Sequence, residues 1–358
     1  MTPQGWQEKT LGEILDKGSS NLSANKLTDC VGIYPVYGAA GLIAKVNFYQ
    51  QDKEYLAIIK DGAGVGRVYH YQPKTSVLGT LQYLYPKSNT DIRFAYYYLQ
   101  SIDFAKYYQG AAIPHIYYRD YKSEKLVLPP LPEQERIVAK LDKAFEAIDK
   151  AKTIAETNLK NAKELFESAL NKAFTENTDG WKEKTLDKAC KKISAGGDKP
   201  EKFLKKNTEI YSVPIYSNGI ENDGLYGYTD VPSIIDEAIT ISARGTIGFV
   251  CKRTKPYYPI VRLISAIPND YINIDFMVYA LQFMVPTGNG SSIPQLTVPM
   301  LKNKMIKYPS LSEQQNIVEK LDALQEQTKQ LEQIYTQKIK KCDELKQSIL
   351  QKAFRGEL

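Results

Sequence analysis

The sequence predicts an α+β protein with two similar domains joined by two long helices, which form an antiparallel coiled coil. Three observations carry this prediction: an internal repeat, two long segments with heptad spacing, and two strand-rich segments that share one order of motifs. With 358 residues the chain is long enough for two hydrophobic cores. Its 43% hydrophobic and 25% charged residues are typical of a globular protein.

The repeat is visible in short motifs that return in the same order. The recurring pairs are Gly5-Trp6 with Gly180-Trp181, Ile113-Pro114 with Ile293-Pro294, Glu133-Gln134 with Glu313-Gln314, and Ala173-Phe174 with Ala353-Phe354. Because order and spacing persist along the whole chain, we infer a duplicated unit of one domain followed by one helix. The predicted division is a first domain at 1–132, a first helix at 133–174, a second domain at 175–310 and a second helix at 311–358.

The two helical segments step through the chain at alternating intervals of four and three residues, the heptad pattern of a coiled coil. The second runs through Ile317, Leu321, Leu324, Thr328, Leu331, Tyr335, Lys338, Cys342, Leu345 and Ile349. The same positions of the first hold Ile137, Leu141, Ala144, Ile148, Ala151, Ala155, Asn158, Ala162, Leu165 and Ala169. Small residues of one helix thus match large residues of the other. We expect antiparallel pairing; the alternative is that each helix packs only on its own domain.

The segments that precede the helices are predicted to be rich in strands. Residues 56–60 and 238–242 are apolar runs typical of buried strands, and each leads into a glycine turn. Residues 67–71 after the first turn alternate like a strand, so we interpret this turn as a hairpin rather than a nucleotide-binding loop. Residues 96–100 and 277–282 are predicted to form short helices.

The net charge of +6 comes from the domains alone. Residues 1–130 hold fourteen Lys and Arg against eleven Asp and Glu, and residues 175–308 hold seventeen against fourteen. The helical segments are balanced. A small positive surplus agrees with nucleic-acid binding but is weak evidence by itself.

The sequence contains no apolar run of membrane-spanning length and no signal-peptide pattern at its start, which predicts a cytoplasmic protein. The four cysteines are scattered and only two histidines are present, so we expect no metal site and interpret the cysteines as free thiols.

No motif predicts that this chain is an enzyme by itself. It lacks the Asn/Asp-Pro-Pro motif of adenine methyltransferases and the phosphate-binding loop of ATPases. Asp120-Tyr121-Lys122 has a spacing found in nucleases, but Met300-Leu301-Lys302 stands at its place in the second repeat. Glu344-Leu345-Lys346 lies on the helix seam. We therefore predict a binding protein without catalytic residues.

DNA recognition needs cations for the phosphates and hydrogen-bonding side chains for the base edges, displayed from rigid loops. Residues of this kind recur at matching places of the two domains. The candidates in the first domain are Tyr37, Lys45, Lys60, Arg67, His70, His115, Tyr117, Tyr118 and Arg119. Those in the second are Ser217, Asn218, Arg244, Lys252, Arg253, Ser292 and Gln295. Any one of them taken alone is more simply an ordinary surface or turn residue, so the prediction depends on the whole set.

A known family shares these features. The motif Pro-Leu-Pro-Glu-Gln-Glu-Arg-Ile-Val opens the first helix at residues 130–138, and a similar motif opens the second at 309–318. Together with the Gly-Trp start of each unit, the turn at 245–248 and the ending at 353–358, they resemble type I restriction-modification specificity subunits. The resemblance extends over the whole chain.

This resemblance implies two target-recognition domains, each of which reads half of a split DNA site, and a coiled coil that sets their spacing. It also implies double-stranded DNA as ligand and, as partners, two methylation subunits and the restriction subunits. S-adenosylmethionine, ATP and magnesium are expected on those partners, and no cofactor on this chain.

One departure concerns the glycine turn. In the first domain Gly62 stands where Arg244 stands in the second, so the role of an arginine there has Lys60 and Arg67 as alternatives. Two other functions remain open: a self-sufficient restriction or modification enzyme, and a coiled-coil scaffold without sequence specificity.

Overall fold

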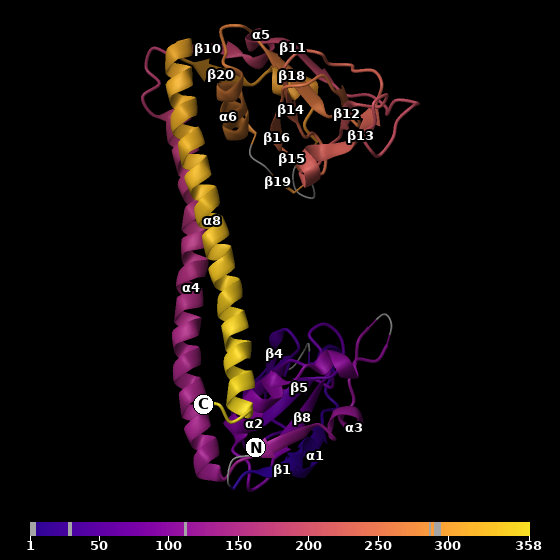
Figure 1. Ribbon diagram of the computed structural model, residues 1–358, viewed down its shortest axis with the longest axis vertical. Helices are drawn as coiled ribbons and strands as arrows, with labels where there is room; N and C mark the ends of the chain where they lie inside the picture. Colours follow the sequence, from indigo (N-terminus) through magenta and orange to yellow (C-terminus); the bar gives the residue numbers. More distant parts are fainter. Residues whose placement is uncertain (1–4, 28–30, 111–112, 286–287, 290–294) are drawn as a thin grey trace. The chain divides into compact units, whose positions relative to one another are not determined.

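The computed structural model describes residues 5–27, 31–110, 113–285, 288–289 and 295–358. The chain forms two compact units: unit 1 comprises residues 1–156 and 336–358, and unit 2 comprises residues 157–335. Each unit contains one globular domain and a part of both long helices, α4 (Leu131–Thr175) and α8 (Leu311–Phe354) (Figure 1).

The domain of unit 1 is built on a four-stranded antiparallel sheet of order β2-β8-β5-β6, with β5 buried along its whole length. A second sheet has the order β4-β3-β7, and β1 pairs with β9. The elements are β1 (Gln7–Thr10), α1 (Leu11–Ile14), β2 (Leu15–Ser19), β3 (Tyr34–Gly38), β4 (Gly41–Val46), β5 (Tyr55–Ile59), β6 (Val68–Tyr71), β7 (Ser76–Val77), β8 (Leu81–Pro86), α2 (Ile92–Ser101), α3 (Tyr118–Tyr121) and β9 (Lys125–Leu128), with 3₁₀ turns at Ala24–Lys26 and Phe104–Tyr107.

The domain of unit 2 has the same plan. Its sheets have the orders β11-β18-β14-β16 and β13-β12-β17, β10 pairs with β20, and a short additional pair joins β15 to β19. The elements are β10 (Lys182–Thr185), α5 (Leu186–Ala189), β11 (Cys190–Ala195), β12 (Val213–Tyr216), a 3₁₀ turn (Glu221–Gly224), β13 (Leu225–Thr229), β14 (Ala238–Ile241), β15 (Thr246–Ile247), β16 (Val250–Arg253), β17 (Tyr258–Pro259), β18 (Ile264–Pro268), α6 (Ile274–Met284), β19 (Gly288–Asn289), α7 (Val298–Lys302) and β20 (Met305–Tyr308). Three matching sheets in matching chain order confirm the duplication.

The predicted strands and hairpins are present, and the predicted short helices are longer than expected. The runs at 56–60 and 238–242 form β5 and β14, and each glycine turn closes an antiparallel hairpin. Helix α2 begins at Ile92 because Asp91 caps it, accepting hydrogen bonds from the N–H groups of Arg93 and Phe94. Asn273 caps α6 in the same way. These capping residues define helix starts that the apolar pattern alone does not show.

A buried glutamine attaches each long helix to the domain that precedes it. Gln134 is fully buried in the first turn of α4; its Oε1 accepts from the Asp91 N–H at 2.8 Å, and its Nε2 donates to the carbonyls of Asn89 and Pro129 at 3.0 and 2.8 Å. Gln314 makes the equivalent bonds in α8, to the Asn273 N–H and to the carbonyls of Tyr271 and Pro309. These bonds give the physical reason for the glutamine of the Glu-Gln motif.

The last turn of the other long helix completes each core. In unit 1, Phe354 of α8 packs edge-on against Phe94 and Tyr98 of α2, with ring centroids 5.3 and 5.1 Å apart. In unit 2, Phe174 of α4 packs against Phe276 and Phe283 of α6. Both helices therefore contribute to both hydrophobic cores.

Within unit 1 the two helices run antiparallel. Asp149 pairs with Lys346, and Lys152 pairs with Asp343 at 2.7 Å, so positions that advance along α4 recede along α8. The alternative in which each helix packs only on its own domain is therefore wrong.

The predicted seam is buried or half-buried at sixteen of its twenty positions and wrong at the other four. Leu141, Ile148 and Ala155 are buried as expected, whereas Ala151, Leu165, Lys338 and Leu345 are exposed. The seam passes instead through the next residue in each case: Lys152, Phe166, Ile339 and Lys346. The reason is packing: Phe166 reaches Tyr279 of α6, with ring centroids 6.2 Å apart, and the two lysines reach carboxylates across the seam.

Candidate nucleic-acid interface

The glycine turn of unit 1, residues 61–66 between β5 and β6, meets the segment at 109–116. Gly62 N–H donates to the Pro114 carbonyl at 3.1 Å, and Ile116 N–H donates to the Lys60 carbonyl at 2.9 Å. Gln109 and His115 exchange two backbone hydrogen bonds. Lys60 and His115, predicted from separate motifs, thus lie on adjoining loops. Residues 111–112 are outside the described part.

Glycine is required in this turn for backbone conformation and for space. Gly62, Gly64 and Gly66 all have φ between 86° and 88°, a region that side chains disfavour. At Gly66 a Cβ atom would lie 2.7 Å from Cβ of Phe104. The hydroxyl of Tyr108 donates to the Val65 carbonyl at 2.8 Å. The turn is therefore held in one shape from both sides.

An exposed aromatic and cationic cluster lies next to this turn. The guanidinium carbon of Arg119 is 4.5 Å from the ring centroid of Tyr117, and the ring of Tyr117 is 5.0 Å from that of His115. Tyr117 and Arg119 are both exposed, and so are Arg67, which follows the turn, and Lys45 on β4. Arg119 is held by this stacking on Tyr117 and by an ion pair, in which its Nε lies 3.4 Å from Asp120 Oδ1.

Three of the unit 1 candidates have partners inside the fold. His70 Nε2 lies 2.9 Å from Glu54 Oε2, and its ring faces Tyr96 of α2. The Tyr118 hydroxyl donates to the Leu15 carbonyl at 2.6 Å. Tyr37 stacks on Tyr71 with ring centroids 4.4 Å apart. These contacts favour structural roles, so the prediction that these residues read DNA is weakened.

In unit 2 the corresponding loops also meet. Asn218 Oδ1 accepts from the Ala243 N–H, and its Nδ2 donates to the Val261 carbonyl, both at 2.7 Å. Leu296 N–H donates to the Ala243 carbonyl at 3.2 Å, which places Gln295 beside the turn at 244–248. Arg244 is exposed at the start of that turn. Ser217 precedes Asn218 and is half-buried; Ser292 lies outside the described residues.

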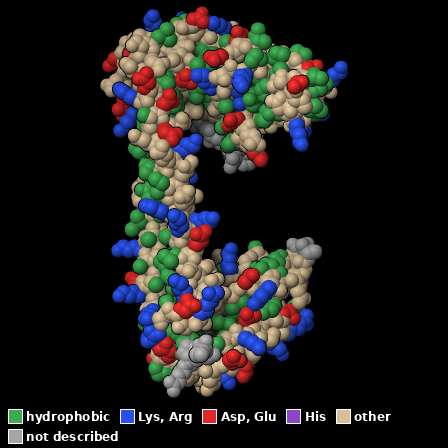
Figure 2. Space-filling view, viewed as in Figure 1, with side chains coloured by type: hydrophobic (Ala, Val, Ile, Leu, Met, Phe, Trp, Pro, Cys, Tyr) green, Lys and Arg blue, Asp and Glu red, His purple; other side chains and the backbone are tan. Residues whose placement is uncertain are grey.

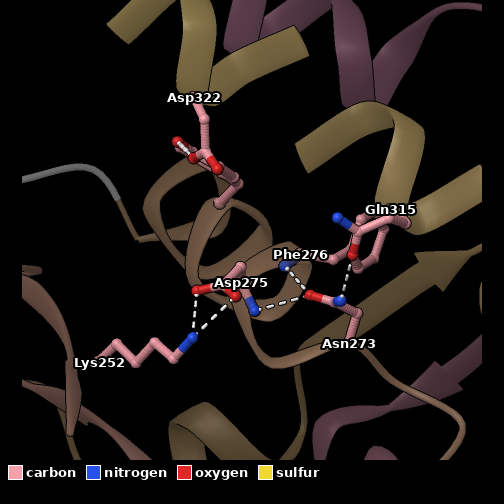
Figure 3. Close-up of polar contacts among 7 residues, drawn as sticks. Lys252, Asn273, Asp275, Phe276, Gln315 and Asp322 are labelled. Atoms are coloured by element: carbon pink, nitrogen blue, oxygen red, sulfur yellow. Dashed lines mark hydrogen bonds and ion pairs between the residues drawn. The ribbon is translucent and has the colours of Figure 1, made fainter. Parts of the chain in front are cut away.

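Two predicted cations of unit 2 are used within the domain. Lys252 Nζ contacts both carboxylate oxygens of Asp275 at 2.8 Å, as Figure 3 shows. Arg253 is only 6% exposed; it donates to Thr240 Oγ1 and to the Asp223 carbonyl, and its guanidinium carbon lies 3.6 Å from the centroid of Tyr216. Direct contact of Arg253 with DNA does not agree with this burial.

The part of α6 that binds Lys252 through Asp275 is also hydrogen-bonded to α8. Figure 3 shows Asn273, which caps α6, donating through its amide to Gln315 at 3.0 Å. The hydroxyl of Tyr279 donates to Asp322. Burial and this carboxylate both raise the pKa of Tyr279, so the hydroxyl remains protonated and keeps donating at neutral pH. In unit 1 Tyr97 makes the same bond to Asp142, with the same direction of pKa shift.

Other expectations about chemistry concern the cysteines and metals. Among the described residues, Cys190, Cys251 and Cys342 are free thiols, and burial raises the pKa of Cys190 to about 12. Cys30 lies outside the described part. No group of three or more His, Cys, Asp or Glu side chains in the described ranges is arranged to hold a metal ion.

On the face in view, Lys and Arg side chains are interspersed with Asp and Glu over both domains (Figure 2). No helix of the described part is long and apolar enough to cross a membrane. The fold thus defines a duplicated two-domain protein, in which one framework presents two different sets of loop residues.

Comparison with known proteins identifies its family. The family model described as the type I restriction modification DNA specificity domain matches residues 3–158 and again 178–341, and the chain belongs to this family. It is 32% identical over 301 residues to the type I specificity subunit S.MpnORF507P of Mycoplasma pneumoniae, covering 82% of each chain. It is 25% identical to the MjaX specificity subunit of Methanocaldococcus jannaschii, covering 90% of this chain and 87% of that one.

Solved structures agree in fold. The HsdS subunit from Thermoanaerobacter tengcongensis matches with a TM-score of 0.57 at 19% identity, covering 100% of this chain and 98% of that one. A chain from a structure titled for complex assembly and conformational transition of the type I R-M system matches with a TM-score of 0.78 at 18% identity, over the full length of both. The predicted resemblance to specificity subunits and the predicted fold class are confirmed, and membership fits a binding protein rather than an enzyme.

Proposed function

We propose that this chain binds double-stranded DNA at a bipartite target, with residues 1–132 reading one half-site and residues 175–310 reading the other. One observation carries this proposal: the two domains share three sheets and their connections, while the loops at the same places carry different side chains. A shared framework with different loops is what two readers of different sequences require.

The exposed loop residues suit the two tasks of DNA binding. In unit 1, Arg67, Arg119 and Lys45 supply cations for phosphates, and Tyr117 with His115 supplies aromatic surface beside them. In unit 2, Arg244 and Gln295 supply side chains that hydrogen-bond to base edges. Lys60, in the same loop cluster, contacts Asp61 at 3.5 Å.

The long helices are proposed to set the spacing of the half-sites and to bind two methylation subunits. Ile154 and Leu345 in unit 1 are about half exposed, and so are Ile334 and Leu165 at the equivalent positions of unit 2. Figure 2 shows hydrophobic side chains among the charged ones on these helices. Apolar positions duplicated on the surface support a pair of identical partners.

In this proposal the partners carry the chemistry. The methylation subunits bring S-adenosylmethionine and act on an adenine that leaves the base stack, and the restriction subunits bring ATP and magnesium. This chain contributes the choice of site: it orients the DNA so that the target adenines face the methylation subunits.

Domain exchange tests the proposal. The chain is combined with the methylation subunit of its own system, and methylated adenines are mapped by single-molecule sequencing. We expect a split motif in which exchanging residues 1–132 for those of a relative changes one half only, and exchanging residues 175–310 changes the other. Unsplit or sequence-independent methylation would overturn the proposal, as would methylation by the isolated chain.

A further inference from the structure

The strand register gives an exact correspondence between the two glycine turns. Ile58 pairs with Val68 in unit 1, and Ile241 pairs with Val250 in unit 2, as the last pairs of the two hairpins. Gly66 N–H donates to the Ile59 carbonyl, and Gly248 N–H donates to the Ser242 carbonyl. Ile59 therefore corresponds to Ser242, and two residues later Asp61 corresponds to Arg244.

This correspondence corrects the alignment made from the sequence, in which Gly62 stood opposite Arg244. The turn of unit 1 is one residue longer, 61–66 against 244–248. Gly62 instead matches Gly245, and both have the left-handed backbone, with φ of 88° and 67°. Neither Lys60 nor Arg67 occupies the position of Arg244.

The surroundings of Asp61 and Arg244 are also alike. In each unit the preceding carbonyl accepts a hydrogen bond from the returning loop, from Ile116 to Lys60 and from Leu296 to Ala243. Among the residues that the structure describes, no atom lies within 4 Å of the place where a Cβ would stand on the following glycine, Gly62 or Gly245. The Asp61 side chain is 44% exposed, and Arg244 is exposed. Both side chains therefore extend from a turn whose backbone is hydrogen-bonded to the returning loop, and both are accessible to solvent.

The two side chains have opposite hydrogen-bonding chemistry. A guanidinium only donates, and in the major groove it matches O6 and N7 of guanine. A carboxylate only accepts, and it matches the amino group of cytosine. Asp61 would be repelled by phosphates, but Lys60 Nζ lies 3.5 Å from its Oδ2 and offsets that charge. In unit 2 the residue at the place of Lys60 is Ala243, which carries no charge.

We infer that Asp61 and Arg244 are equivalent base-reading positions, at which Arg244 donates to a guanine of one half-site and Asp61 accepts from a cytosine of the other. This inference rests on the proposed function and adds the residue and the base chemistry to it. It predicts one base pair in each half-site whose identity depends on this single side chain.

Substitution of the two residues tests the inference in the complex with methylation subunits. Arg244→Ala is expected to reduce discrimination at one base pair of one half-site by about tenfold to a hundredfold, the range for a lost bidentate contact. Asp61→Ala is expected to reduce discrimination by about tenfold at one base pair of the other half-site, because it removes a single hydrogen bond to a charged group. The measurements are methylation maps and equilibrium binding to duplexes that carry each single base change.

Lys255→Gln is the matched control for Arg244, because it also removes one exposed positive charge from unit 2. Lys255 follows the end of β16 that is opposite to the turn. The Lys255→Gln variant is expected to leave the methylated DNA motif unchanged. Circular dichroism of each variant shows whether its fold is intact.

The outcomes separate the inference from the proposed function. If the wild-type complex methylates a split motif but Arg244→Ala lowers affinity evenly for all sequences, Arg244 contacts only phosphate and the inference is wrong. The inference is also wrong if the base pair at which Asp61→Ala loses discrimination lies in the half-site that Arg244 reads. If the wild-type complex shows no split motif, the proposed function itself fails.

Discussion

The substitution Gln134→Ala tests how the domain of unit 1 is fastened to α4. Gln134 is fully buried and its amide makes three hydrogen bonds to backbone groups: the N–H of Asp91 and the carbonyls of Asn89 and Pro129. Removing the amide leaves these groups without their partner in a buried place, which costs about 1–3 kcal/mol for each unpaired group. Because water and local relaxation recover part of this, we expect a loss of about 4 kcal/mol in the free energy of unfolding of unit 1.

Tryptophan fluorescence can follow the two units separately. Trp6 packs against the core of unit 1, and Trp181 packs near Phe276 in unit 2. In a Trp181→Phe background only Trp6 reports, and in a Trp6→Phe background only Trp181 reports. With a urea m-value of about 2 kcal/mol per molar, Gln134→Ala should lower the midpoint seen by Trp6 by about 2 M and leave the midpoint seen by Trp181 nearly unchanged.

Two further variants make the test specific. Gln134→Glu keeps an acceptor for the Asp91 N–H but loses both donors, so it should also be destabilising. Glu135→Ala changes the next residue, which is exposed, and should alter stability by less than about 0.5 kcal/mol. A midpoint for Gln134→Ala within about 0.3 M of the wild type would refute the reasoning.

Two more predictions concern unit 2. Arg253→Ala removes a buried guanidinium that donates to Thr240 and Asp223, so we expect the free energy of unfolding followed by Trp181 to fall by about 2–4 kcal/mol. The control Lys255→Gln should change it by less than about 0.5 kcal/mol. An Arg253→Ala protein that is stable but no longer binds DNA would instead place Arg253 in the interface. Burial raises the pKa of Cys190 from 9.0 to about 12, so above pH 9 the unfolded state loses a proton that the folded state keeps, and stability falls by up to about 1.4 kcal/mol for each pH unit until about pH 12. Cys190→Ala should remove this part of the slope in urea titrations between pH 8.5 and 10.5, and an unchanged slope would contradict the assignment.

Much of the fold could be predicted because its signals are local. The strands β5 and β14 are continuous apolar runs, and the glycines that follow them mark hairpins. The long helices are visible from their heptad spacing. The exact seam was not predictable, because Leu165 and Phe166 are neighbours with equal claim to the inner face, and only contact with Tyr279 decides between them.

The sequence predicted which loops form the candidate interface but not which of their side chains are accessible. Within unit 1 the loops of Lys60 and His115 meet, and within unit 2 the loops of Arg244 and Gln295 meet, as their repeated positions indicated. Lys252 and Arg253 look the same as these in a sequence, but they point into the domain, toward Asp275 and Tyr216. Asp61 was missed because an acidic residue is not the usual sign of a DNA reader and because the two turns differ in length.

By itself the sequence determined the duplication, the family, the strand-rich domains and the long helices, since each follows from repeated motifs or from periodicity within a short stretch. Tertiary structure alone decided which charged side chains are available and which positions of the two domains correspond. Availability depends on partners far along the chain, such as Asp223 for Arg253, and correspondence depends on strand register rather than on counting residues. For that reason the sequence placed Gly62 opposite Arg244, and the structure places Asp61 there.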